Sequence, residues 1–223
     1  MRARLLAFAA IILIGTGVIM YITYNQVNKR TVPILNPNDI NSVLVDSTLQ
    51  QKGIGHTITP FNLINQDRET VTNSLIEGKI VIADFFFTTC PSICPKMTSQ
   101  LKRVHDYFES SNQIIILSHT VWPEVDSVPV LKEYALRYDA NPKKWQFLTG
   151  SKVHLYDLAR KSYFVAPSLT DTNFTHGSEN DFVHTENVVL VDSQKRIRGY
   201  YDGTDPEEMD NLILDIEALL LKK

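Results

Sequence analysis

The sequence predicts an α/β fold built on a central sheet of mainly parallel strands. Two apolar runs, KIVIADFFF and QIIILS, have the unbroken hydrophobicity typical of strands that are covered on both faces. Each run is followed by a segment whose apolar residues recur at helical spacing. Because strands and helices alternate in this way, the strands should run parallel and be joined by right-handed crossovers.

The remaining elements extend this alternation. A hairpin of TITPFNLIN and ETVTNS comes first, and a helix, a strand and a helix are expected after QIIILS in SVPVLKEYALRYD, WQFLT and SKVHLYDLARKSY. Two further strands, NVVLVDS and KRIRGYYDG, form an antiparallel pair that makes the sheet mixed. A closing helix begins at Pro206 behind the N-cap Asp205. This order predicts a thioredoxin-like fold with a central mixed sheet and an added N-terminal hairpin.

The N-terminus predicts a membrane anchor. The apolar run from Leu5 to Tyr24 has the length of roughly 20 residues that a membrane-crossing helix needs. It ends in IMYI, which is not the small-residue pattern of a cleaved signal peptide. We therefore expect a single N-terminal transmembrane helix, with a cytoplasmic N-terminus and a periplasmic soluble domain. A domain that faces the cytoplasm is the alternative, because Lys29 and Arg30 after the run partly balance Arg2 and Arg4 before it.

The chain divides into three predicted parts. Residues 1–30 form the anchor, residues 31–52 a polar linker with several prolines and asparagines, and residues 53–223 one folded domain. Hydrophobic residues make up 43% of the chain, which is ordinary for a protein with a packed core. The net charge of −3 and the lack of a basic stripe in the sequence argue against nucleic acid as a partner.

Cys90 and Cys94, the only two cysteines, lie in TTCPSICPKM directly after the first buried strand. A disulfide between them would close a very short loop, so it would add little as a structural cross-link. Packing as small hydrophobic residues also fits poorly, since both lie beyond the strand end among polar residues and prolines. A redox pair and a metal site remain as interpretations.

Both interpretations depend on the helix that follows. Thiolates near a helix N-terminus are stabilised by its dipole and free N–H groups, which lowers the thiol pKa and favours redox chemistry. The usual dithiol motif has two intervening residues, whereas Pro91, Ser92 and Ile93 separate this pair. The wider spacing suits two sulfur ligands of one ion, and thiolates select Cu(I) or Zn(II), while an added imidazole also admits Cu(II). Because the chain has no further cysteine, a histidine is the expected third ligand.

The six histidines differ in how well their positions suit a ligand. Three are expected to be packed or solvated, namely His56, His105 and His154. His119 follows QIIILS and so belongs to the carboxyl edge of the sheet, where such folds keep their sites. His176 and His184 flank GSENDFV in a long loop, and long loops in compact domains are more often functional than idle. His184 is the better anchored of the two, because a strand begins three residues later.

The chain resembles the Sco/SenC family, membrane-tethered copper proteins of cytochrome c oxidase assembly. Four motifs carry the resemblance and occur in the same order: DFFFTTCPSICPKM, VLKEYALRY, WQFLTG and VHTENVVLVD. The resemblance covers roughly residues 55 to 221. The combination of Cys-Pro-x-x-Cys-Pro with a distal His-Thr before a strand is specific.

The resemblance implies a copper site and a role for it. In that family two cysteines and a distal histidine bind one copper ion, and the matching positions here are Cys90, Cys94 and His184. The chain would then be a metallochaperone rather than an enzyme, with copper as Cu(I) or Cu(II). It would deliver copper to the CuA site of cytochrome c oxidase, reduce the cysteines of that site with its redox-active pair, or both. The implied partner is the copper-bearing oxidase subunit or another copper-relay protein.

Two positions depart from the family pattern. The family usually has an aspartate directly before the histidine, where this chain has Val183. It often has Asp-Pro-Glu after the third strand, where this chain has Trp122 before the proline. Carboxylates that orient a ligating histidine tune metal affinity, often by about 10–100-fold. The departures therefore bear on copper affinity and oxidation-state preference and not on the ligand set.

Two other functions fit the same residues. A thiol-disulfide oxidoreductase or thiol peroxidase would use Cys90 and Cys94 without delivering copper, because disulfide exchange needs no distal imidazole. A redox or copper sensor would bind a partner and transfer nothing. Dependence on His184 separates the copper protein from the enzyme, and a partner screen separates delivery from sensing.

Overall fold

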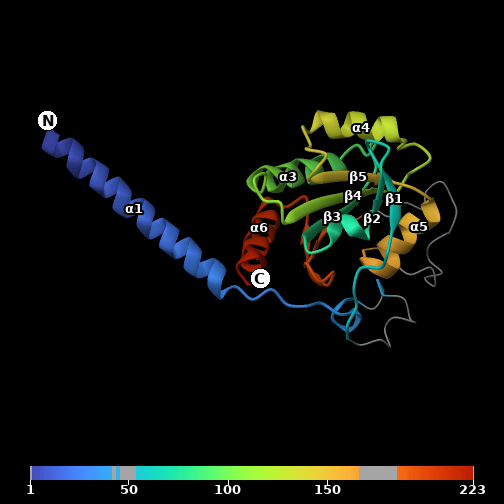
Figure 1. The fold of residues 1–223 in the computed structure, drawn as a ribbon, viewed down its shortest axis with the longest axis horizontal. Coiled ribbons are helices and arrows are strands. Elements are labelled where there is room, and N and C mark those ends of the chain that lie inside the picture. Colours follow the sequence, from blue (N-terminus) through green and yellow to red (C-terminus); the bar gives the residue numbers. More distant parts are fainter. Residues whose placement is uncertain (1, 42–43, 46–53, 166–184, 223) are drawn as a thin grey trace. The chain divides into compact units, whose positions relative to one another are not determined.

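The computed structural model describes residues 2–41, 44–45, 54–165 and 185–222 (Figure 1). The chain divides into two compact units, one of residues 33–212 and one of residues 1–32 together with 213–223. The larger unit contains the sheet and the cysteine motif.

Strands in the described residues form one seven-stranded mixed sheet in the order β2-β1-β5-β4-β3-β6-β7. Its parallel centre consists of β3 (Ile80–Phe86), β4 (Ile114–Thr120) and β5 (Trp145–Thr149). Its antiparallel outer strands are β1 (Asn62–Asn65), β2 (Thr70–Thr72), β6 (Asn187–Val191) and β7 (Ile197–Asp202). The predicted mixed sheet of a thioredoxin-like fold, with its N-terminal hairpin, is confirmed.

The larger unit has the predicted helices in their predicted order, together with two short 3-10 helices that were not predicted. They are η1 (Pro37–Asp39), η2 (Asn73–Ile76), α3 (Ile93–Tyr107), α4 (Val128–Arg137), α5 (Lys152–Asp157) and the first part of α6 (Pro206–Leu221). The helix expected from SKVHLYDLARKSY changes character after α5, because a π-helical turn, η3 (Leu158–Ser162), continues it. There Tyr163 N donates to Leu158 O at 2.8 Å, and Phe164 ends the turn in a left-handed conformation with φ 51°.

The central strands are apolar throughout because both faces of the sheet are covered. Successive side chains of a strand point to opposite faces, and Phe86 contacts Tyr134 of α4 at 5.2 Å while Phe85 contacts Tyr163 at 5.6 Å between ring centroids. Figure 1 shows α4 and α5 on opposite sides of the sheet. Every residue of β3 and of β4 is buried, which explains the two unbroken apolar runs.

The smaller unit consists of α1 (Arg2–Lys29), the residues up to Val32 and the end of α6. Arg30 forms an ion pair with Asp215, and Lys222 Nζ donates to the Arg30 carbonyl oxygen at 2.6 Å. These contacts join the residues directly after α1 to the C-terminal part of this unit.

The predicted transmembrane helix is wrong. Crossing a membrane takes roughly 20 predominantly apolar residues in one helix, and none of the helices in the described ranges is both long enough and apolar enough to do so. The predicted localisation depended on that helix. The prediction of single-pass anchoring, with a cytoplasmic N-terminus and a periplasmic domain, is therefore not supported either.

Gly203 directly follows β7 and has no room for a side chain. A Cβ at this position would lie 2.5 Å from Met97 Cγ, 2.8 Å from Val188 Cγ2 and 3.0 Å from Glu186 O. Its N–H also donates to Glu186 O at 2.7 Å, so the backbone is held at that separation.

We expect Gly203→Ala to lower the free energy of unfolding by about 1–3 kcal/mol, because overpacking forces neighbouring groups to shift. Urea unfolding followed by circular dichroism measures the change. Gly17→Ala in α1 is the control, since an added Cβ there meets nothing within 4 Å. An equal effect of the two substitutions would contradict the packing argument.

Candidate metal centre

The cysteine motif lies at the carboxyl edge of the parallel strands. β3 ends at Phe86 and α3 begins at Ile93, so Cys90 lies in the connecting loop and Cys94 in the first turn of the helix. Phe86 pairs with Thr120 at the end of β4, and Val121 N donates to Phe86 O at 2.9 Å. The loop that follows β4 therefore starts beside the loop that carries Cys90.

Both cysteines are free thiols and are nearly buried, with exposed fractions of 8% for Cys90 and 5% for Cys94. Cys90 N donates to Phe87 O at 3.2 Å, which turns the loop toward the helix. Cys94 N points at Cys90 Sγ from 3.4 Å. The start of α3 thus lies against the first sulfur, and the second sulfur belongs to the same turn.

This packing gives the two thiols opposite acidities. Burial alone would raise the pKa of the Cys90 thiol, but hydrogen bonds from the backbone N–H groups of residues 92–94 and from the Cys94 thiol outweigh burial and lower it. Burial raises the pKa of the Cys94 thiol to about 12, and negative charge on Cys90 and Asp84 adds to the increase. Cys90 is therefore the more reactive sulfur.

Asp84 is a buried carboxyl group beneath the motif that the sequence analysis missed. Ser118 Oγ donates to its carboxylate, and Trp145 Nε1 donates to Ser118 Oγ at 2.9 Å. Burial, only partly offset by the Ser118 hydrogen bond, raises the pKa of Asp84 to about 7. The available signal was one acidic residue inside the apolar run KIVIADFFF.

A hydroxyl pair secures the first turn of α3 from below. Thr98 Oγ1 donates to the Cys94 carbonyl oxygen at 2.8 Å and lies 2.8 Å from the hydroxyl of Tyr134 in α4. On the outer side, the ring of Trp122 meets Phe87 edge-on at 6.1 Å between centroids. Trp122, one of the two positions that depart from the expected pattern, therefore adds an aromatic ring beside the cysteine loop.

His119 is the expected histidine of the sheet edge, and it lies on the face opposite Asp84. Its ring stacks on Phe85 with 4.8 Å between centroids, and its Nδ1 lies 3.2 Å from Asp84 O. That carbonyl can only accept, so Nδ1 carries the proton. Nε2 has no hydrogen-bond partner among the described residues. Burial lowers the pKa of His119 to about 4.

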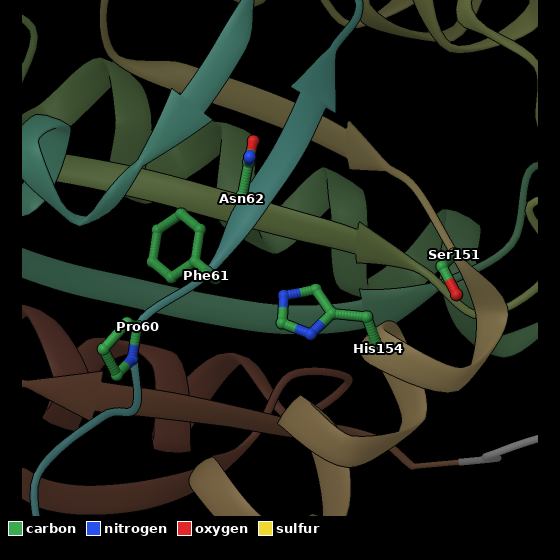
Figure 2. Close-up of a pocket in the computed structure, with 5 residues that line it drawn as sticks. All are labelled: Pro60, Phe61, Asn62, Ser151 and His154. Carbon is green, nitrogen blue, oxygen red and sulfur yellow. The ribbon is translucent and has the colours of Figure 1, made fainter.

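Of the three histidines expected to be packed or solvated, His105 and His56 have hydrogen-bond partners, whereas Nε2 of His154 has none among the described residues. His105 Nδ1 lies 2.9 Å from Asp106, and His56 Nε2 lies 2.8 Å from Ser162 O. His154 lines a pocket of about 440 Å³ whose other lining residues are Pro60, Phe61, Asn62 and Ser151. Figure 2 shows the His154 ring, which comes from α5, beside Phe61 at the entry to β1.

The predicted ligand set is not complete in the described ranges. His184, His176 and Val183 lie outside them. Within them, no group of three or more His, Cys, Asp or Glu side chains could hold a metal ion. Cys90 and Cys94 are thus together in the structure, and the third ligand stays a prediction.

A family model described as SCO1/SenC matches residues 50–220. The chain belongs to the SCO1/SenC family. The predicted resemblance is therefore confirmed. Among curated relatives of this SCO1/SenC protein, the SCO1 protein homolog of Bacillus subtilis (strain 168) is 28% identical over 167 residues, which are 74% of this chain and 83% of the relative.

Solved structures support the same assignment. BsSco, described as a member of the Sco family of cytochrome c oxidase assembly proteins with a disulfide switch, is 27% identical with a TM-score of 0.62. The match covers 76% of this chain and 96% of BsSco. Arabidopsis thaliana ScoI, solved with copper bound, is 26% identical with a TM-score of 0.58, over 75% of this chain and 99% of that one.

The unequal thiols predict selective alkylation. At neutral pH, iodoacetamide should modify Cys90 of the reduced protein much faster than Cys94, because the pKa of Cys90 is lowered and that of Cys94 is raised to about 12. Peptide mapping by mass spectrometry after short reaction times measures both rates. In denaturant the two rates should converge, and equal rates in the folded protein would contradict the assignment.

His119 predicts a loss of stability in acid. Between pH 6.5 and about 4 the unfolded chain binds a proton that folded His119 does not. The contribution of His119 to the free energy of unfolding therefore falls as the pH falls through this window, by on the order of 3 kcal/mol. Asp84, whose pKa is raised to about 7, contributes in the opposite direction, so the effect of His119 is read from the difference between the variant and the unmodified chain. We expect His119→Phe, which keeps a ring against Phe85, to remove this loss.

Urea unfolding of both proteins near neutral pH and near pH 4.5 measures the difference. His56→Gln is the control and should keep the pH dependence that His119 causes. If His119→Phe loses as much stability in acid as the unmodified chain, then His119 is not the group responsible.

Proposed function

We propose that this SCO1/SenC protein binds one copper ion through Cys90 and Cys94 and acts in the assembly of cytochrome c oxidase. The observation that carries the proposal is the pair of free, nearly buried thiols at the start of α3. Thiolates are the soft ligands that Cu(I) prefers, and both sulfurs belong to one turn, so the donor set fits copper. The copper-bound structure of Arabidopsis thaliana ScoI supports the choice of metal.

The two thiols differ in how readily they lose a proton to become copper ligands. Cys90, with its lowered pKa, supplies a thiolate at little cost, whereas Cys94 must release a proton when it becomes a ligand. Asp84 lies close enough to Cys94 for its charge to raise that pKa, so it disfavours the Cys94 thiolate until copper is present. Copper, when bound, supplies the positive charge that stabilises both thiolates.

His184 is the proposed third ligand. It directly precedes Thr185, and β6 begins at Asn187, three residues after His184. β6 runs antiparallel to β3 with Val189 opposite Ala83, so the start of β6 lies toward the carboxyl end of β3. The strand that follows His184 therefore enters the sheet at the edge that carries the cysteines, which supports the proposal.

The proposed target is the CuA site of cytochrome c oxidase, to which the protein delivers copper or whose cysteines it reduces. Reduction is favoured by one observation, the reactive Cys90 beside a protonated Cys94. The Cys90 thiolate attacks a disulfide sulfur of the partner and forms a mixed disulfide, and one partner thiolate leaves. Cys94 then loses its proton and displaces the second partner thiol as the Cys90–Cys94 disulfide forms. Two electrons pass to the partner.

Titration of the reduced full-length chain with Cu(I) against a competing chelator tests the copper site. We expect one ion per chain, loss of binding in Cys90→Ser and in Cys94→Ser, and weaker binding in His184→Ala, because each variant removes one ligand. His154→Ala is the matched control, because it also removes an imidazole but from the pocket of Figure 2, which neither cysteine lines. This variant should bind Cu(I) as tightly as the unmodified chain.

The same variants separate copper delivery from disulfide reduction. If His184→Ala binds copper as tightly as the unmodified chain, the three-ligand site is wrong. If the reduced chain binds no Cu(I) yet reduces a disulfide substrate at a rate that His184→Ala does not change, the protein is a thiol-disulfide oxidoreductase.

A further inference from the structure

Asp126 is a buried carboxylate that joins the cysteine loop to the loop after β4. Its side chain is fully buried just before α4, whose N-cap is Ser127. Thr88 N lies 3.2 Å from each of its carboxylate oxygens, and Thr88 Oγ1 donates to Oδ1. Thr88 comes two residues before Cys90. The carboxylate thus holds the cysteine loop by both its backbone and a side chain.

The second carboxylate oxygen fixes Asp126 to its own loop. Thr120 Oγ1 donates to Oδ2 and accepts a hydrogen bond from Trp122 N at 2.9 Å. Asp126 N donates to Trp122 O at 2.9 Å, which closes the loop on itself. Asp126 therefore cannot move without moving the end of β4, and Thr88 is tied to that rigid point.

The donors that face Asp126 are neutral. Across the described part of the chain, its side chain makes hydrogen bonds to Thr88 and Thr120 and no ion pair with Lys, Arg or His. A buried carboxylate is costly unless it is well hydrogen-bonded. Hydrogen bonds to a charged acceptor are about twice as strong as neutral ones, so this arrangement suits a group that must fix geometry.

We propose that Asp126 is a positioning residue for the cysteine motif, which holds Thr88 so that Cys90 Sγ stays against the N–H groups at the start of α3. The path is short, because Thr88 follows Phe87, whose carbonyl accepts from Cys90 N at 3.2 Å. Release of Thr88 lets this turn relax and takes Cys90 Sγ away from Cys94 N, now at 3.4 Å. The consequence for copper rests on the proposed function, whereas the consequence for thiol reactivity does not.

Asp126→Asn tests the proposal in the full-length chain. The amide keeps the shape but replaces one acceptor oxygen with an N–H₂ group, which cannot accept from Thr88 or Thr120. We expect the rate of Cys90 alkylation at neutral pH to fall about tenfold, equivalent to a rise of about one pKa unit. The pH profile of that rate should shift upward, which a loss of global stability alone would not cause.

Asp192→Asn is the matched control. Asp192 is also a buried carboxylate, held by Arg196 and Arg198, but it follows Val191, which pairs with Val81 near the start of β3. It therefore lies at the end of the sheet away from Cys90. We expect it to lower stability and leave the Cys90 alkylation profile unchanged.

If Asp126→Asn does not fold, two variants of Thr88 test the same hydrogen bond from its other end. Thr88→Ser retains the hydroxyl and should behave like the unmodified chain, whereas Thr88→Val loses it and should slow alkylation. The proposal is overturned if the profile of Cys90 is the same in Asp126→Asn or Thr88→Val as in their controls. A chain that binds no Cu(I) but shows these alkylation shifts would contradict the proposed function and leave the positioning role intact.

Discussion

The parallel pairing of β3 with β4 is the constraint on which the site depends. Its register sets Phe86 opposite Thr120, so the chain leaves both strands at the same edge of the sheet. The cysteine loop and the loop that contains Asp126 then have to lie side by side, although they are far apart in sequence. If β4 slipped by one residue against β3, the side chains of β4 would turn to the opposite faces of the sheet, so Ser118 would leave Asp84 and His119 would leave Phe85.

The spacing of apolar residues in the sequence correctly predicted the strands and helices of the central sheet. The unbroken apolar runs predicted β3 and β4, and the position of TTCPSICPKM after the first run correctly predicted a motif between a strand and a helix. Asp84 and Asp126 could not be found in this way. Their partners lie 34 and 38 residues away, at Ser118 and Thr88, and only the sheet brings them together.

Some predictions were wrong or incomplete because one sequence pattern is compatible with two different structures. SKVHLYDLARKSY has the apolar spacing of one α-helix, but a π-helical turn follows Asp157. This turn changes the direction in which the last side chains of the segment point, and the ring of Tyr163 contacts Phe85. His119 was placed correctly on the carboxyl edge of the sheet. Strand alternation, however, turns its ring toward Phe85 and away from the face that holds Asp84. The apolar N-terminal run suggested a membrane anchor, which the helices of the described residues do not support.

The reactive sulfur of this protein owes its acidity to hydrogen-bond donors and not to ionic partners. The groups that lower the pKa of Cys90 are backbone N–H groups of residues 92–94 and the Cys94 thiol, and none of them is a cation. Dissolved salt screens interactions between exposed charges, whereas short contacts inside a nearly closed turn are screened much less. The reactivity of Cys90 should therefore be almost independent of ionic strength, which lets the motif behave alike in dilute and in concentrated electrolyte.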